Sequence, residues 1–256
     1  MKALDELVEV VRRLRAEDGC PWDRAQTPST MRPYLLEEAY EVLGAIDRGD
    51  RDELRRELGD VLFQVVMLAQ MAEEVGDFAL QDVIAGATDK MVRRHPHVFE
   101  RGRASEREGW GIAAWEAQKS AERPARQSAL DGVPEALPAL LRAHRVSEKA
   151  GRVGFDWPDV AGVREKLDEE VAELDAAIAG GDEDAIAEEL GDVLFTVVNL
   201  GRHLPVGAED ALRLATRRFE DRFKRVELAL AEQGRTLYDT PADALERIWR
   251  AAKGTR

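Results

Sequence analysis

The chain has 256 residues, of which 34% are charged and 6% aromatic, and its formal net charge is −14. Because proteins that bind nucleic acids neutralise phosphates with a basic surface, this acidic balance argues against direct nucleic-acid binding. The single cysteine, Cys20, rules out an intramolecular disulfide, and no apolar run approaches the roughly 20 residues that a membrane helix needs, so we expect a cytoplasmic protein with no membrane partner.

The sequence predicts an all-α fold made of two tandem homologous helical-bundle domains. Apolar residues recur at spacings of three and four along the chain instead of alternating, which is typical of amphipathic helices. Residues 35–66 align with residues 167–198 without a gap, and the run ELGDVLF that starts at Glu57 recurs unchanged from Glu189. Such internal identity indicates a duplicated unit.

The boundary between the two copies is expected within residues 120–138. Three prolines and a glycine stand there among small and polar residues, a composition typical of linkers. We therefore predict an N-terminal domain over residues 1–119 and a C-terminal domain over residues 139–256, each with an antiparallel hairpin of two acidic helices.

The first hairpin is predicted to turn at Gly49. On helices over residues 35–46 and 54–69, apolar side chains form one face of each helix, and two acids lie one turn apart at the edge of each face. The short connection forces the helices to be antiparallel, which brings both edges to the same side and to matching levels. Four carboxylates should therefore meet in one groove. They are Glu38, Glu41, Glu57 and Asp60.

The second hairpin repeats this arrangement about Gly181. Close carboxylates repel one another, and all-oxygen ligands suit Mg²⁺ or Mn²⁺ while leaving positions for water and substrate phosphates. We therefore predict Mg²⁺, with Mn²⁺ as the alternative ion, in each groove; a solvated face of glutamates is the competing interpretation. A di-iron site is excluded because none of the four histidines has a glutamate three residues before it. The ligands predicted in the second groove are Glu170, Glu173, Glu189 and Asp192.

The chain resembles the MazG family of nucleoside triphosphate pyrophosphohydrolases along nearly its whole length. The acidic signature of the family, EExxE followed by ExxD, begins at Glu37 and again at Glu169. Other segments that resemble the family are GCPWDxxQT at 19–27, RRHPHVF at 93–99 and VGFDW at 153–157. The resemblance implies an all-α fold, Mg²⁺ dependence, a homodimer, and hydrolysis of nucleoside triphosphates between the α and β phosphates, which would control the nucleotide pool.

The resemblance assigns catalysis mainly to the C-terminal domain. Glu37 and Glu169 point further from the apolar faces than the neighbouring acids, so we expect them to orient or deprotonate water rather than to bind metal directly. The residues predicted for catalysis are Glu169, Glu170, Glu173, Glu189, Asp192 and, in the first domain, Glu37.

Cationic and aromatic side chains are expected to hold the nucleotide, since phosphates need donors and a base needs a flat partner. Arg218 and Arg222 share one helix face, and Lys166 stands one turn before Glu170 where the first domain has Tyr34, which favours the second domain for catalysis. Salt-bridged arginines and packed tryptophans are the alternative interpretation. The residues that the resemblance and these equivalences assign to the nucleotide are Lys166, Arg218, Arg222, Trp249 and Lys253 in the second domain, with Lys90, Arg94, Trp115 and Lys119 in the first.

Two other functions stay open at this point. The first domain could be a noncatalytic dimerisation module or a regulatory nucleotide-binding module that keeps its acids for a structural ion. Alternatively, the whole chain could be a helical interaction protein, in which case Mg²⁺ would not change its melting temperature.

Overall fold

The structure is a computed structural model, and it describes residues 2–99 and 128–253. Helices are the only regular secondary structure in these two ranges, which confirms the predicted all-α class. The described residues form two compact units, one in each range, and each unit is described by itself. Within the described ranges, no helix combines the length and the apolar character needed to span a membrane.

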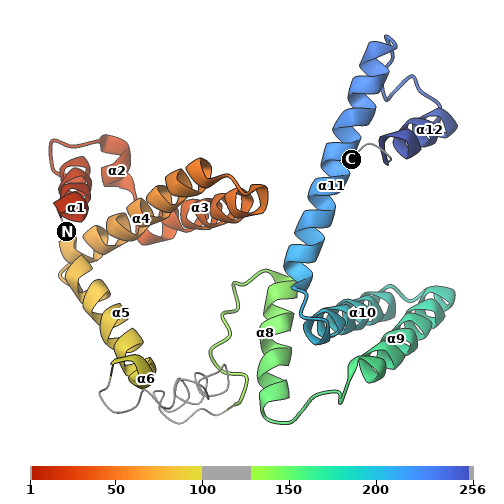
Figure 1. Cartoon of the computed structure of the whole chain (residues 1–256), viewed down its shortest axis with the longest axis horizontal. Coiled ribbons are helices and arrows are strands. Elements are labelled where there is room, and N and C mark those ends of the chain that lie inside the picture. The colour runs from red at the N-terminus through yellow and green to blue at the C-terminus, as the bar shows by residue number, and fades with distance from the viewer. Residues whose placement is uncertain (1, 100–127, 254–256) are drawn as a thin grey trace. The chain divides into compact units, whose positions relative to one another are not determined.

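The N-terminal unit is built around a helical hairpin of α3 (Pro28–Arg48) and α4 (Arg51–Glu74), which pack side by side (Figure 1). The chain reverses at Gly49, whose φ of 66° is a left-handed conformation that glycine adopts without a steric penalty. Asp50 then begins α4 by accepting hydrogen bonds of 3.1 and 2.9 Å from two backbone N–H groups of its first turn. The predicted turn at Gly49 is confirmed.

Four shorter helices complete the described part of this unit. They are α1 (Lys2–Arg15), α2 (Pro21–Ala25), α5 (Leu80–Arg94) and α6 (Pro96–Phe99). Of these, α1 and α5 contact α4, α2 contacts α1, and α6 contacts α5. One cluster of buried apolar side chains forms the core of this unit, and its members are Val11, Met31, Val66, Met67, Ala69, Met71 and Leu80. Because most of these residues belong to the second half of α4, the core lies there, and the acidic first half of α4 stays outside it.

The C-terminal unit repeats the hairpin with α9 (Val160–Gly180) and α10 (Glu183–His203). Gly181 has a φ of 72°, and Asp182 accepts hydrogen bonds of 3.1 and 3.4 Å from backbone N–H groups in the first turn of α10. Before the hairpin, α8 (Ala139–Arg152) packs against α10. The same local signals therefore build the same turn in both copies.

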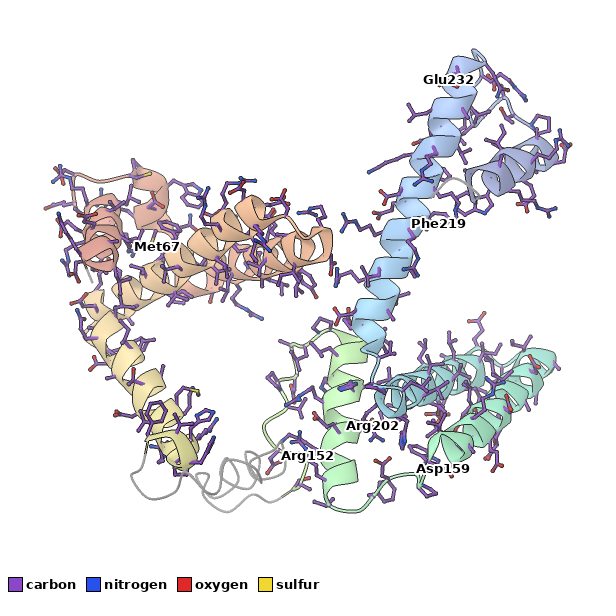
Figure 2. All side chains as sticks on the ribbon, viewed as in Figure 1. Met67, Arg152, Asp159, Arg202, Phe219 and Glu232 are labelled. Atoms are coloured by element: carbon purple, nitrogen blue, oxygen red, sulfur yellow. The ribbon has the colours of Figure 1, made fainter. Side chains whose placement is uncertain are left out.

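The loop between α8 and α9 is fastened to the end of α10 by Asp156. Arg202 donates a hydrogen bond of 2.7 Å to Oδ2 of Asp156, and Nε2 of His203 lies 3.1 Å from its Oδ1. These contacts, first of all those from Arg202, lower the pKa of Asp156 from 3.8 to about 2, because they stabilise the ionised carboxylate. Figure 2 labels Arg202 on α10 and Asp159 just before α9. The contact therefore ties the entry of the hairpin to its exit.

The last two helices, α11 (Ala208–Glu232) and α12 (Ala242–Lys253), extend away from the hairpin of their unit (Figure 1). Among the described helices, α11 contacts α8, α10 and α12, whereas α12 contacts α11 alone. Figure 1 shows α12 beside the far part of α11 and apart from α9 and α10. The C-terminal unit therefore holds an acidic hairpin and a separate α11–α12 pair.

Candidate metal centre and nucleotide site

The predicted acidic groove of the C-terminal unit forms between α9 and α10. One carboxylate oxygen from each of Glu170, Glu173 and Glu189 lies within 4.8 Å of the other two. Asp192 stands one turn after Glu189 on α10 and is not part of this close triplet. The antiparallel pairing thus brings three of the four predicted ligands within reach of a single ion, with the fourth one turn away.

The N-terminal groove has the same geometry between α3 and α4. Oxygens of Glu38, Glu41 and Glu57 lie within 4.8 Å of one another, and Asp60 stands outside this triplet. The charge of Asp60 nevertheless reaches Glu38 and contributes to raising its pKa. The duplicated sequence therefore produces two carboxylate triplets, each with an aspartate nearby.

Desolvation and, after it, neighbouring negative charges raise the pKa of glutamates in both grooves. Partial burial, followed by the charge of Asp60, raises the pKa of Glu38, and partial desolvation, followed by Glu41, raises that of Glu57. In the second groove, desolvation and the neighbouring Glu170 raise the pKa of Glu173, although Lys166 acts in the opposite direction. Several close carboxylate oxygens whose charge is destabilised form a donor set that fits a hard divalent cation.

The two grooves differ in the partner of their most buried glutamate. In the second groove, Nζ of Lys166 lies 2.7 Å from Oε1 of Glu169 and 2.9 Å from Oε1 of Glu170, and both contacts raise the pKa of the lysine. The side chain of Glu170 is only 7% exposed, so its charge is balanced by the ammonium group. The predicted nucleotide ligand Lys166 is thus bound to the acids themselves.

The first groove has no cation at the position equivalent to Lys166. Tyr34 stands there, and its ring packs edge-on against Trp22 with the ring centroids 5.8 Å apart. The partner of Glu38 is instead Gln64, a neutral side chain whose hydrogen bond lowers the pKa of Glu38 without reversing its rise. Gln64 is buried, and its Oε1 accepts no hydrogen bond from the residues that the structure describes.

Glu37 and Glu169, expected to act on water, have different surroundings. Glu169 is more than half exposed and is held by Lys166. Glu37 lines a pocket of about 410 Å³ in the N-terminal groove, which Arg48 and Glu53 flank with an ion pair of 2.6 Å. The full lining is Glu37, Tyr40, Glu41, Gly44, Arg48, Glu53 and Glu57.

Several of these groove residues were not predicted. Gln64 lies one helical turn after Asp60, and Arg48 lies two turns after Glu41, so the spacing that located the acids also applies to them. The second domain has small residues, Ala172 and Gly180, where the first has Tyr40 and Arg48. The pocket therefore combines acids shared by both copies with residues, Tyr40 and Arg48 among them, that only the first copy has.

Two of the predicted nucleotide residues, Arg222 and Trp249, come together between α11 and α12. The guanidinium carbon of Arg222 lies 4.9 Å from the centroid of the Trp249 ring, and the ring of Phe219 lies 5.1 Å from it. Arg218 is exposed one turn earlier on α11. Lys253 ends α12, and its side chain lies outside the described part of the structure. This cluster makes no contact with α9, because neither α11 nor α12 touches that helix within the described residues.

The equivalent residues of the first domain are only partly described. Lys90 is exposed on α5, and Arg94 is half-buried in its last turn. Trp115 and Lys119 lie outside the described residues. A base-stacking site in the first domain therefore stays a prediction.

Comparison with known proteins gives matches that include both hairpins. The family model described as MazG nucleotide pyrophosphohydrolase domain matches residues 26–99 and 160–227. A nucleoside triphosphate pyrophosphohydrolase from Escherichia coli (strain K12) is 46% identical over 258 residues, which cover 99% of this chain and 98% of that protein.

Two further relatives extend the likeness beyond one organism. The nucleoside triphosphate pyrophosphohydrolase/pyrophosphatase MazG of Thermotoga maritima is 44% identical over 251 residues, or 98% of this chain and 95% of that protein. The uncharacterized protein YabN of Bacillus subtilis is 42% identical over 248 residues, which cover 96% of this chain but 50% of that protein. The tandem arrangement of this chain thus also matches half of a longer protein.

Proposed function

Since this chain belongs to the MazG family of nucleotide pyrophosphohydrolases, we propose that the groove between α9 and α10 is where it cleaves nucleoside triphosphates. The protein is a nucleoside triphosphate pyrophosphohydrolase, a hydrolase that acts on acid anhydrides. The bond cleaved is the one between the α and β phosphates, and the products are a nucleoside monophosphate and pyrophosphate. The observation that supports the location is the Glu170, Glu173 and Glu189 triplet with Lys166 beside it.

The donor set of this groove suits Mg²⁺, with Mn²⁺ as a substitute, because its ligands are all carboxylate oxygens. Glu170, Glu173 and Glu189 would hold the ion, with Asp192 as a further ligand. When bound, such an ion offsets phosphate charge and lowers the pKa of a coordinated water. Glu169, at the exposed edge of the groove, accepts the proton of the attacking water, and Lys166 donates to the phosphates.

Arg222 and Trp249 are proposed to hold the base and the phosphates of the nucleotide, together with Arg218 and Lys253. A charged planar group over an indole ring provides both a flat apolar surface and a cation. Arg222 lies about 20 Å along α11 from Ala208, the first residue of this helix. Among the described helices, α12 contacts only α11. Within one chain, therefore, this cluster and the acidic groove stand apart.

A homodimer would bring the two parts of the site together across copies. The exposed face of α10 carries Leu190, Leu194 and Val197, which are 47%, 48% and 41% exposed at helical spacing. The equivalent residues of α4, Leu58 and Leu62 among them, are 51% and 43% exposed. Apolar faces of this kind are covered in stable proteins, and a second copy of this chain is the occupant that we propose.

The N-terminal domain, proposed as residues 1–119, is joined by a linker over residues 120–138 to the domain that begins at 139. Tyr34 in place of Lys166 supports a second role for this domain, as a regulatory or dimerisation module that binds an ion or nucleotide without turnover. Its retained triplet of acids supports ion binding in either role.

The test of the proposed function is product analysis. The full chain is incubated with Mg²⁺ and each nucleoside triphosphate in turn, and the phosphorus-containing products are separated and quantified. Equal amounts of nucleoside monophosphate and pyrophosphate are expected, and both should disappear in the Glu170→Gln variant. Nucleoside diphosphate with inorganic phosphate, or turnover that survives Glu170→Gln, would overturn the assignment of bond or groove.

A further inference from the structure

The duplicated grooves differ in charge at one position that touches the metal ligands. Lys166 contacts Glu170, the buried member of the second triplet, whereas Tyr34 occupies the same place in the first repeat. The remaining acids of the two triplets are equivalent in sequence and in spacing. The charge at this position therefore bears directly on cation binding in the second groove.

In the second groove, Lys166 and a divalent cation compete for the same carboxylate. Nζ lies 2.9 Å from Oε1 of Glu170, and a positive charge at that distance repels a cation bound to the same group. The pair is shielded from water on the side of Glu170, whose side chain is 7% exposed, so solvent screens the repulsion only in part. A cation that arrives alone must displace the ammonium group or bind beside it.

A nucleotide removes this competition. The lysine side chain has a flexible stem and three N–H donors, and the polyphosphate offers several anionic oxygens in place of two carboxylates. Once Lys166 donates to phosphate, Glu170 is free to bind the cation with its full charge. Each ligand thus improves the site for the other, and such coupling is reciprocal.

The first groove has no lysine at the position equivalent to Lys166. The partner of Glu38 is the neutral amide of Gln64, and Tyr34 packs edge-on against Trp22. Among residues 2–99, no ammonium group has to move before a cation binds to Glu38, Glu41 and Glu57.

We propose that Lys166 makes cation and nucleotide occupancy of the C-terminal groove depend on each other, whereas the N-terminal groove takes up a divalent cation without nucleotide. The proposal rests on the proposed function, since it assumes that the polyphosphate binds beside Lys166. It assigns the lysine a positioning role before the reaction, in addition to its contact with phosphate.

The first test measures Mn²⁺ binding to the full chain without nucleotide, from the electron paramagnetic resonance signal of the free ion. Glu38→Gln removes the first groove as a competing site. The Glu38→Gln variant is then compared with the double variant that also carries Lys166→Met. We expect Mn²⁺ to bind the second groove about tenfold more tightly after Lys166→Met, a coupling near the lower end of the usual range. Lys166→Arg, which keeps the charge, should not show this gain.

A matched control separates local competition from net charge. Arg164 stands on the same helix and forms an ion pair of 2.7 Å with Asp168, outside the triplet. Arg164→Met removes one positive charge and should leave Mn²⁺ affinity unchanged within about twofold. An equal gain for Arg164→Met and Lys166→Met, or no gain for Lys166→Met, overturns the proposal. In the converse variant, Tyr34→Lys in a Glu170→Gln background should weaken Mn²⁺ binding to the first groove.

The second test measures the coupling itself with the α,β-methylene analogue of a nucleoside triphosphate, which resists cleavage at the proposed bond. Its affinity is determined by calorimetry with chelator and with saturating Mn²⁺. Because association of Mn²⁺ with the analogue in solution is common to all variants, it cancels when variants are compared. The ratio of the affinity for the analogue with Mn²⁺ to that with chelator should fall about tenfold in Lys166→Met. An unchanged ratio contradicts the coupling even if turnover depends on Glu170, whereas loss of that dependence contradicts the proposed function instead.

Discussion

The guanidinium carbon of Arg222 lies 4.9 Å from the centroid of the Trp249 ring, which joins α11 to α12 at a position remote from α9. The contact assembles a cation and a flat indole from two helices. We expect the nucleotide to be held on this Arg222–Trp249 platform. The platform comes after the acidic groove in the sequence and does not contact α9.

The first prediction concerns this platform. Trp249→Ala should raise KM for nucleoside triphosphates about tenfold with a smaller change in kcat, because base stacking and the cation–π contact act mainly on binding. Arg222→Ala should act in the same direction. Steady-state kinetics checks both, and Arg250→Ala is the matched control, since Arg250 pairs with the exposed Glu246 on α12. An equal rise in KM for Arg250→Ala would mean that the effect is not specific to the platform.

The second prediction compares the two acidic triplets. Glu170→Gln should reduce kcat by about 100-fold or more, because it removes a ligand of the proposed cation, whereas Glu38→Gln should leave most activity. Steady-state assays with saturating nucleotide and Mg²⁺ measure kcat for both variants. Glu165→Gln, an exposed position on α9 outside the triplet, serves as control. If Glu38→Gln abolishes turnover and Glu170→Gln spares it, the first domain is the active one.

The third prediction is a dependence of stability on the divalent cation. Mg²⁺ at about ten times its dissociation constant should stabilise the folded protein by about 1.4 kcal/mol and raise the melting temperature by about 5 °C relative to chelator. Differential scanning calorimetry measures the shift. The double variant Glu38→Gln with Glu170→Gln should lose most of it. A wild-type melting temperature that does not change with Mg²⁺ would contradict cation binding in both grooves.

The fourth prediction concerns Asp156 and pH. Its pKa falls from 3.8 to about 2 on folding, so its stabilising effect is complete above pH 3.8 and is lost as the pH falls through about 2. Asp156→Asn should therefore lower the free energy of unfolding by about 1–2 kcal/mol at pH 7, with a difference from wild type that shrinks between pH 4 and pH 2. Urea denaturation at several pH values tests this. Asp168→Asn, which breaks an exposed pair with Arg164, should change little at any pH.

The fifth prediction concerns the proposed homodimer. Leu194→Glu places a charge on the exposed apolar face of α10 and should halve the molar mass measured by light scattering, because a charge buried in an interface is costly. Leu62→Glu applies the same change to the first repeat. Tyr238→Glu, at a fully exposed position, should keep the wild-type mass. If neither leucine variant alters the mass, these faces are not the interface between copies.

Local sequence determined the hairpins. Gly49 and Gly181 have positive φ angles of 66° and 72°, and the aspartate after each accepts hydrogen bonds from the next helix. Those signals act over a few residues, and helical periodicity then fixes which edge of each helix holds the acids. The all-α class, the duplication and the meeting of acids from paired helices could therefore be read from the chain alone.

Tertiary structure alone decided some of the contacts between helices. Glu38 has Gln64 from the opposite helix as its neighbour, a contact that spacing along α3 does not give. The contact of 2.9 Å between Lys166 and Glu170, by contrast, joins residues four apart on α9 and follows from helical spacing. Like the contact of Glu38, the packing of α12 on α11 and not on the acidic hairpin is not given by spacing. Such choices depend on rotamers, burial and competition among several partners of similar energy, and these are set by the packing of whole helices and not by the spacing of residues along one of them.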